Sequence, residues 1–356
     1  MKKSRITGIL FKGLFFLFIF GFLCSCNGDD GCPSQQNNPN EDIYVAGGMR
    51  VSGMTRATYW KNGVPITLNE GTRASMANDI FIKGSDIYVV GYVKNEQYEE
   101  MPALWINGAE SLLNIRGASG MAYSVFVADK IYIGGYESNG PVTARLWVSG
   151  NSEYVTPLNE GIAEIRSIYV DQNKVYLAGY EYEGNNKIAK YWIYDSQGSN
   201  PFEEFTLDQQ QGQVNDNVAN SIVVKNNKIY IAGRDDKGAV LWTNNVPTRL
   251  YPDDPKSLGQ SIFIKNNDIY VAGISGDQPT NMAWYWKNGE LTNLSRGDGD
   301  LEFANSIAVG EENIYVVGSL RNSAVEWATL WTNNTPEDLT KNKTNSWANS
   351  VKIVKK

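Results

Sequence analysis

The sequence has 356 residues, a net charge of −7 and an isoelectric point near 4.9. An acidic chain lacks the basic face that neutralises phosphates, which excludes nucleic acid as an expected partner. The chain contains no histidine, the commonest general base and the usual zinc ligand. Its cysteines, Cys24, Cys26 and Cys32, all precede the repeats described below. We therefore expect no catalytic residue, no cofactor and no metal site.

The N-terminal residues 1–25 have the pattern of a signal peptide. Lys2, Lys3 and Arg5 form a positive start, and an apolar run follows from Leu14 to Leu23. This run is shorter than the roughly 20 apolar residues that a membrane-spanning helix needs. The segment is therefore expected to be an export signal.

The end of this signal, Leu23-Cys24-Ser25-Cys26, resembles the lipobox of bacterial lipoproteins. Leu23, Ser25 and Cys26 match that pattern, and Cys24 is a less usual second residue. The resemblance implies that Cys26 is acylated and anchors the mature chain to a membrane, as in an outer-membrane lipoprotein of a Gram-negative bacterium. The alternatives are an ordinary signal peptide with free cysteines and an uncleaved anchor.

Residues 26–41 are expected to be the lipidated Cys followed by a disordered tether, because Asn27 to Asn40 is polar, rich in turn residues and without apolar periodicity. Its Asp29-Asp30 pair resembles the acidic export signal of surface-exposed lipoproteins. The alternative is a merely soluble linker, and the sequence leaves both open.

Residues 42–356 repeat one stretch of the type Ile-Tyr-Val-Ala-Gly seven times, at steps of 40 to 54 residues. Such a period is typical of repeat architectures. The copies begin at Ile43, Ile87, Ile131, Val175, Ile229, Ile269 and Ile314.

Within one repeat the pattern predicts four short strands separated by Gly and Asn turns. An Ile or Val marks the first strand, the repeated stretch is the second, a Trp marks the third and a Leu the fourth. We expect the repeated Trp side chains to fill the core between neighbouring sheets, with the indole N–H reaching a partner near the rim. The end-of-strand Gly is expected to supply positive φ or a close backbone approach.

The ends of the repeat region predict how the fold closes. The chain enters at a second strand, Ile43, and ends at a first strand over residues 348–354. Together they complete one sheet, with the C-terminal strand innermost and three N-terminal strands outside it, which leaves no open edge. We therefore predict an all-β fold, a seven-bladed β-propeller with four-stranded blades.

The second-strand motif, with its Trp about 13 residues after the Gly, resembles a kelch repeat. The resemblance is loose, because only Gly47-Gly48 and Gly134-Gly135 supply the expected Gly pair. Kelch propellers mostly act as binding platforms, which the resemblance extends to this chain only as an analogy of fold.

Loops of variable length follow the second strand and the fourth strand, and both classes emerge on one face of a propeller. We expect a binding site there. Tyr123, Arg166 and Asn220 occupy one equivalent position just before the first strand; the alternative is that this position bonds backbone. Trp284, Trp327 and Trp347 lie outside the repeated Trp position and suit a sugar or protein partner as exposed aromatics; the alternative is that they pack in the core.

The function expected from these features is non-enzymatic: a monomeric surface or outer-membrane lipoprotein whose propeller binds a glycan or a protein. The alternative is a propeller glycoside hydrolase or polysaccharide lyase, which needs no histidine. The carboxylates Asp298, Asp300 and Glu302 share one loop, but the loop lacks the length and pattern of an EF-hand and is expected to be solvated.

Replacing Cys26 with Ser tests the anchor. The variant is expected to lose a metabolic fatty-acid label and to leave the membrane fraction, because it lacks the acylated thiol. The matched variant Cys32→Ser keeps both properties. A Cys26→Ser protein that still carries the label contradicts the lipobox assignment.

Overall fold

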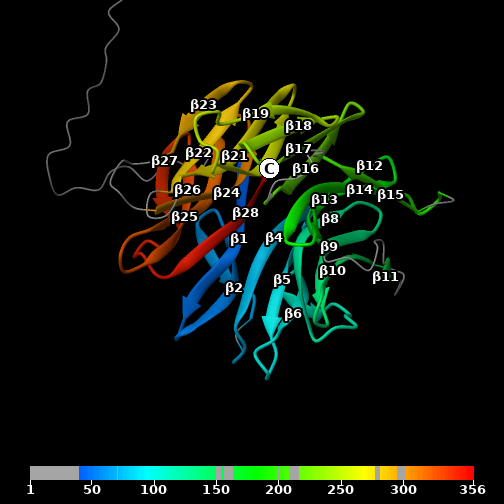
Figure 1. Ribbon diagram of the computed structural model, residues 1–356. Coiled ribbons are helices and arrows are strands. Elements are labelled where there is room, and N and C mark those ends of the chain that lie inside the picture. The colour runs from blue at the N-terminus through cyan, green and yellow to red at the C-terminus, as the bar shows by residue number, and fades with distance from the viewer. Residues whose placement is uncertain are drawn as a thin grey trace, which may run out of the picture. The chain divides into compact units, whose positions relative to one another are not determined.

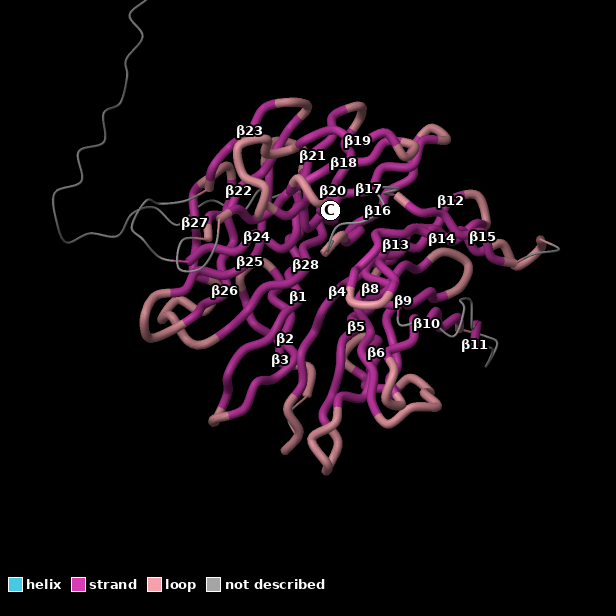
Figure 2. Tube along the Cα trace, in the orientation of Figure 1, coloured by secondary structure: helices cyan, strands magenta, loops and turns pink. Residues whose placement is uncertain are grey.

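The computed structural model describes residues 40–69, 71–149, 154–155, 163–198, 201–207, 216–276, 281–294 and 301–356. Residues Asn37–Lys356 form one compact unit. The regular elements of the described part are all β-strands (Figure 2), and it contains no helix long and apolar enough to cross a membrane. The expected signal peptide, Cys26 and nearly all of the tether lie outside the described residues.

The described strands form seven antiparallel sheets of four strands, the blades. Blade 1 holds β4 (Ser75–Lys83), β5 (Asp86–Lys94), β6 (Glu100–Ile106) and β7 (Ala109–Leu112); blade 2 holds β8 (Ser119–Val127), β9 (Ile131–Ser138), β10 (Val142–Val148) and β11 (Tyr154–Val155). Blade 3 holds β12 (Ala163–Asp171), β13 (Lys174–Glu183), β14 (Asn186–Tyr194) and β15 (Phe202–Thr206); blade 4 holds β16 (Val218–Lys225), β17 (Lys228–Asp235), β18 (Gly238–Thr243) and β19 (Val246–Arg249). Blade 5 holds β20 (Leu258–Lys265), β21 (Asp268–Ser275), β22 (Met282–Lys287) and β23 (Glu290–Asn293); blade 6 holds β24 (Leu301–Val309), β25 (Ile314–Arg321), β26 (Glu326–Thr332) and β27 (Thr335–Asp338).

Blade 7 closes the ring from both ends of the repeat region. Its order is β28 (Ser346–Lys355), β1 (Glu41–Val51), β2 (Met54–Lys61) and β3 (Val64–Thr67), so the C-terminal strand is innermost. Figure 1 shows the red β28 beside the blue β1. The predicted all-β, seven-bladed propeller and its mode of closure are confirmed.

The core lies between successive blades. One cluster joins Tyr44 and Ala57 of blade 7 to Ile80, Val89 and Trp105 of blade 1, and the other interfaces repeat this arrangement. Every repeated Trp is at most 9% exposed, as predicted: Trp60, Trp105, Trp147, Trp192, Trp242, Trp286 and Trp331. Truncating such a side chain to Ala costs about 3–5 kcal/mol.

One detail of the expected repeat holds only in part, and another is wrong. The indole N–H bonds Asn114 O in Trp147 and a Glu204 oxygen in Trp192, but it is buried without a partner in Trp60, Trp105 and Trp331. The marker Leu of the six repeats in which it is described lies directly after the fourth strand and not in it, and Leu158 lies outside the described residues. There its N–H donates to a third-strand carbonyl in the pairs Leu68–Ala57, Leu113–Pro102, Leu207–Ala189, Leu250–Ala239, Leu294–Ala283 and Leu339–Ala328.

Each innermost strand carries a β-bulge at the same place. The register with the second strand skips one residue in each blade: Asn78, Tyr123, Arg166, Asn220, Gln260, Asn305 and Asn349. A bulge leaves its extra residue outside the ladder and redirects its side chain. The equivalent position recognised in the sequence is therefore the bulged position.

The end-of-strand Gly makes the bulge possible. In blade 1, a Cβ built on Gly91 would overlap the carbonyl oxygen of Met76, two residues before the bulged Asn78. The same overlap with backbone occurs at Gly47, Gly135, Gly179, Gly233, Gly273 and Gly318. None of these glycines has positive φ. Of the two expected reasons for Gly, close backbone approach is the one that applies.

Replacing Gly91 with Ala is expected to destabilise the protein by about 3 kcal/mol, because the methyl group and the Met76 carbonyl cannot share the space. The matched variant Gly84→Ala, at a turn Gly with φ +61 and open space around its Cα, is expected to lose only about 1 kcal/mol. Urea unfolding measures both. Equal losses would contradict the proposed role of Gly91.

Candidate functional site

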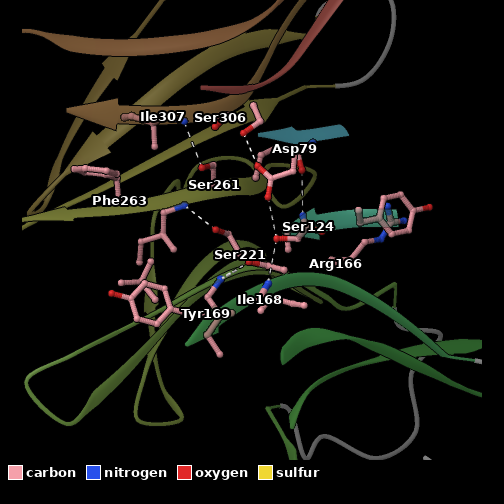
Figure 3. Close-up of a pocket in the computed structure, with 18 of the residues that line it drawn as sticks. Asp79, Ser124, Arg166, Ile168, Tyr169, Ser221, Ser261, Phe263, Ser306 and Ile307 are labelled. Carbon is pink, nitrogen blue, oxygen red and sulfur yellow. Dashed lines mark hydrogen bonds between the residues drawn. The ribbon is translucent and has the colours of Figure 1, made fainter. Parts of the chain in front are cut away.

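The innermost strands of all seven blades line one central cavity of about 470 Å³ (Figure 3). This volume falls within the range of about 300–1,000 Å³ typical of small-molecule sites. The bulged residues supply its first level. Because the innermost strands run from the loop-rich face toward the face of tight turns, this level is the one nearer the loop-rich face.

Four bulged Asn side chains hold the blades together around this level. Each amide nitrogen donates to a backbone carbonyl of the next blade at 2.9–3.0 Å, in the pairs Asn78–Ala122, Asn220–Gly259, Asn305–Ala348 and Asn349–Ala77. Asn220 also donates to the Gln260 side chain. For these four residues the structural alternative, backbone bonding, is confirmed, and they line the cavity as well.

The second level is a chain of hydroxyl groups. In five blades a Ser Oγ accepts the first-strand N–H of the next blade at 3.1–3.3 Å, in the pairs Ser124–Ile168, Ser167–Ile222, Ser221–Ile262, Ser261–Ile307 and Ser306–Val351. Figure 3 shows several of these bonds as dashed lines. One Ser hydrogen bond of this kind thus crosses each of these five interfaces.

Blade 1 replaces this Ser with Asp79, which closes the chain of hydrogen bonds. Its carboxylate accepts the hydroxyls of Ser350 at 2.6 Å and Ser124 at 3.1 Å. It also accepts the N–H of Ile80 at 2.9 Å and that of Val125 at 3.0 Å. A single carboxylate therefore joins blades 7, 1 and 2, and it is only 9% exposed.

The third level is aromatic over part of the ring. Phe81, Phe126, Tyr169 and Phe263 each follow the bulged residue of their strand by three positions and line the cavity. The ring centroids of Phe81 and Phe126 are 4.9 Å apart, and those of Phe126 and Tyr169 are 5.2 Å apart. The charged Lys352 takes the same position in blade 7, so this level is aromatic in these four blades and cationic in blade 7.

Tyr123 and Arg166 depart from the ring of amides. The Arg166 guanidinium carbon lies 4.3 Å from the Tyr123 ring centroid and 5.6 Å from that of Tyr180 on β13. Its Nε lies 3.2 Å from a carboxylate oxygen of Glu164. Tyr136 on β9 packs against Tyr123 with centroids 5.8 Å apart. Blades 2 and 3 therefore present an aromatic and cationic group where most of the other blades present amides.

This environment keeps the tyrosines neutral. Burial raises the pKa of Tyr123 and of Tyr180 well above the usual range, and the nearby Glu164 carboxylate raises both further. Burial opposes the charge of Arg166, but the guanidinium pKa is raised, and at neutral pH the anion beside it is the Glu164 carboxylate. The tyrosines and the guanidinium offer hydrogen-bond donors and ring faces at neutral pH.

The Trp residues expected at the site have different positions. Trp284 and Trp327 are 1% and 0% exposed and pack in the core. The expectation of exposed aromatics is wrong for these two, because their strands bury both faces between blades. Trp347 is half-buried on β28, where it pairs with Gly48, and it is not among the residues that line the cavity.

The described central cavity has few ionisable side chains in its lining. Asp79 is the only carboxylic acid among the residues that line the described cavity. Arg166 and Lys352 are the only cationic residues in that lining. The described part of the chain holds no cluster of three metal-ligating side chains. Glu302 is buried on β24, and Asp298 and Asp300 lie outside the described residues.

No family model and no curated protein matches this chain. Among solved structures, a puromycin hydrolase has 10% identity and a TM-score of 0.57, with 85% of this chain and 52% of that protein covered. A puromycin-hydrolyzing peptidase of Mycobacterium tuberculosis has 8% identity and a TM-score of 0.56, with 83% and 52% covered. The propeller domain of the Trilobed protease from Pyrococcus furiosus has 12% identity and a TM-score of 0.48, with 84% and 94% covered.

The chain thus spans about half the length of the two puromycin-cleaving proteins. At such low identity the likeness concerns the fold alone. The strands and their closure define this protein as a seven-bladed β-propeller.

Replacing Asp79 with Asn is expected to destabilise the protein by about 3 kcal/mol, because an amide NH₂ would face groups that are themselves donors. Asp79→Ser restores the residue of the other six blades and is expected to cost about 1 kcal/mol. Chemical unfolding compares the two. An Asn variant as stable as the Ser variant would contradict the role of the carboxylate.

Proposed function

We propose that this chain is a lipid-anchored binding protein whose propeller holds a glycan at the loop-rich face, around the mouth of the central cavity. The observation that carries the proposal is the Tyr123–Arg166 pair. It stands at the bulged position, which lines the cavity, and it interrupts a ring of amides, four of which donate to a backbone carbonyl of the next blade. Tyrosine combines a ring face for sugar C–H groups with a hydroxyl for hydrogen bonds.

The preformed geometry supports binding. The amide ring and the hydroxyl chain tie each blade to the next, so the cavity needs little ordering when a ligand enters. A pre-organised site avoids part of the entropy loss of association. The guanidinium of Arg166 is held between two aromatic rings and a carboxylate, which restricts its orientation as well.

An enzymatic role is the second candidate, and the described cavity favours it less. Glycoside hydrolysis generally uses two carboxyl groups about 5–9.5 Å apart, whereas Asp79 alone lines the described cavity and accepts four hydrogen bonds. A lyase needs a base, and burial raises the pKa of Tyr123, which disfavours the phenolate.

We further propose that Cys26 carries the lipid, that the protein resides in the outer membrane of a Gram-negative bacterium, and that it is a monomer of divergent kelch-like repeats. The outer strands support the monomer. Pro65, Pro247 and Pro336 lie within β3, β19 and β27, at positions paired with core Trp residues. Proline on an edge strand removes a donor and discourages pairing with a second copy.

The test is a thermal shift of the purified full-length chain against a panel of polysaccharides and their oligosaccharides. A ligand at one hundred times its Kd raises stability by about 2.7 kcal/mol. Arg166→Ala is expected to weaken binding at least about tenfold, or 1.4 kcal/mol, because it removes the cation and its stacking on Tyr123.

Arg321→Ala serves as the matched control, since Arg321 is an exposed Arg at the end of β25, outside the cavity lining. It is expected to bind like the parent protein. A panel without any shift overturns the glycan proposal, and turnover of a bound sugar moves the assignment to the enzyme.

A further inference from the structure

The loop between β5 and β6 exposes an aromatic side chain in an unfavourable backbone conformation. Tyr98 is 80% exposed, more than any other large hydrophobic side chain exposed in the described chain. Its φ is +64, a region that side chains with a Cβ rarely occupy. The strain and the exposure occur in the same residue of a loop on the loop-rich face.

Five other blades have a glycine at positive φ in the connection between the second and third strands. Between the second and third strands, positive φ occurs at Gly53 with the small Ser52 beside it, at Gly140, Gly184 and Gly276, and at Gly238, the first residue of β18. Gly meets this requirement without strain. Blade 1 alone among these six places a bulky residue there. Strained residues of this kind persist where the surroundings hold them, and they concentrate at ligand contacts.

Asn95 holds the loop in shape. Its side-chain oxygen accepts the N–H groups of Gln97 and Glu99, and its amide nitrogen donates to the Glu99 carboxylate at 2.8 Å. Two backbone bonds, from Asn95 to Glu99 and from Tyr98 to Asn95, close the turn. Tyr98 is therefore presented from a fixed backbone, and its rigid ring loses little entropy when a ligand covers it.

The charges around Tyr98 and around the central cavity indicate the kind of sugar. Tyr98 is flanked by Glu96 and Glu99, whose carboxylates accept hydroxyl protons but repel anionic groups. The two cations that line the described cavity each lie near a carboxylate. Arg166 is 3.2 Å from Glu164, and Lys352 is 3.9 Å from Asp79.

We infer that Tyr98 is a stacking contact for the glycan, and that this glycan is built from neutral sugars. The inference rests on the proposed glycan-binding function and names the ligand class and a residue for it. The ring of Tyr98 covers the C–H face of a sugar, and Glu96 beside it accepts hydroxyl protons. Uronic and sulfated sugars meet like charge at this loop.

The experiment measures affinity and melting temperature on the full-length protein. Calorimetric titrations use neutral polysaccharides (mannan, xylan, starch and laminarin) and the acidic alginate and polygalacturonate. Tyr98→Phe keeps the ring and is expected to bind within about threefold of the parent protein. Tyr98→Asn removes the ring but suits positive φ, so it is expected to lose at least tenfold in affinity with no loss of melting temperature.

Val246→Asn is the control, because Val246 is an exposed apolar residue, 65% accessible, on the outer strand β19. It is expected to leave affinity unchanged. Neutral-glycan binding that survives Tyr98→Asn overturns the role of Tyr98 and leaves the proposed function standing. Binding of acidic glycans only overturns the neutral class alone. A parent protein that binds no glycan at all overturns both proposals.

Discussion

The contact between a second-strand glycine and the neighbouring strand's backbone is the constraint on which the rest of this propeller depends. Without a Cβ, Gly91 lets the carbonyl of Met76 approach its own Cα, and the innermost strand gains one extra residue, Asn78. That bulge changes which way the following side chains face. The repeated Gly therefore determines both the shape of each inner strand and which side chain enters the cavity.

The hydrogen bonds inside the cavity follow from the same bulges. With the bulged Asn directed toward the centre, its amide reaches the backbone of the next blade, and the following Ser reaches that blade's first-strand N–H. The interfaces are thus fastened by polar contacts at the centre and by buried Trp side chains farther out. Because the two chain ends pair within blade 7, these contacts continue across it, and its Ser350 donates to the Asp79 carboxylate of blade 1.

Much of this fold can be predicted from the sequence, because a pattern that is weak in one copy becomes strong evidence when it recurs seven times. A single Ile-Tyr-Val-Ala-Gly stretch predicts little, but seven copies predict seven blades, and the unequal ends predict the closure through β28 and β1. The bulged position was also visible as an alignment column, with Tyr123 and Arg166 in it. The bulge itself cannot be seen in the sequence, because an extra residue in the innermost strand is recognised only from its register with the second strand.

The errors have a common physical cause. Trp284 and Trp327 lie outside the repeated Trp position, which suits either a surface or the core, and in a blade packed on both faces a residue off the pattern still points into an interface. Tyr98 gave no sequence signal, because its importance lies in its φ and exposure and neither is encoded in a periodic position. A Ser precedes the first-strand Ile or Val in six of the seven repeats, but its hydrogen bond depends on the position of the next blade's N–H, which the sequence does not show.

Departures from the sevenfold pattern are the informative positions in a closed repeat protein. A feature present in every blade, such as the buried Trp or the bulge, is sufficiently explained by packing and closure. A feature present once needs another reason. Asp79 has one in the junction of blades 7, 1 and 2, where it satisfies four donors. Tyr123, Arg166 and Tyr98 have no comparable structural necessity, because amides serve the first two positions in other blades and glycine serves the third. The proposed ligand recognition would supply a reason for all three.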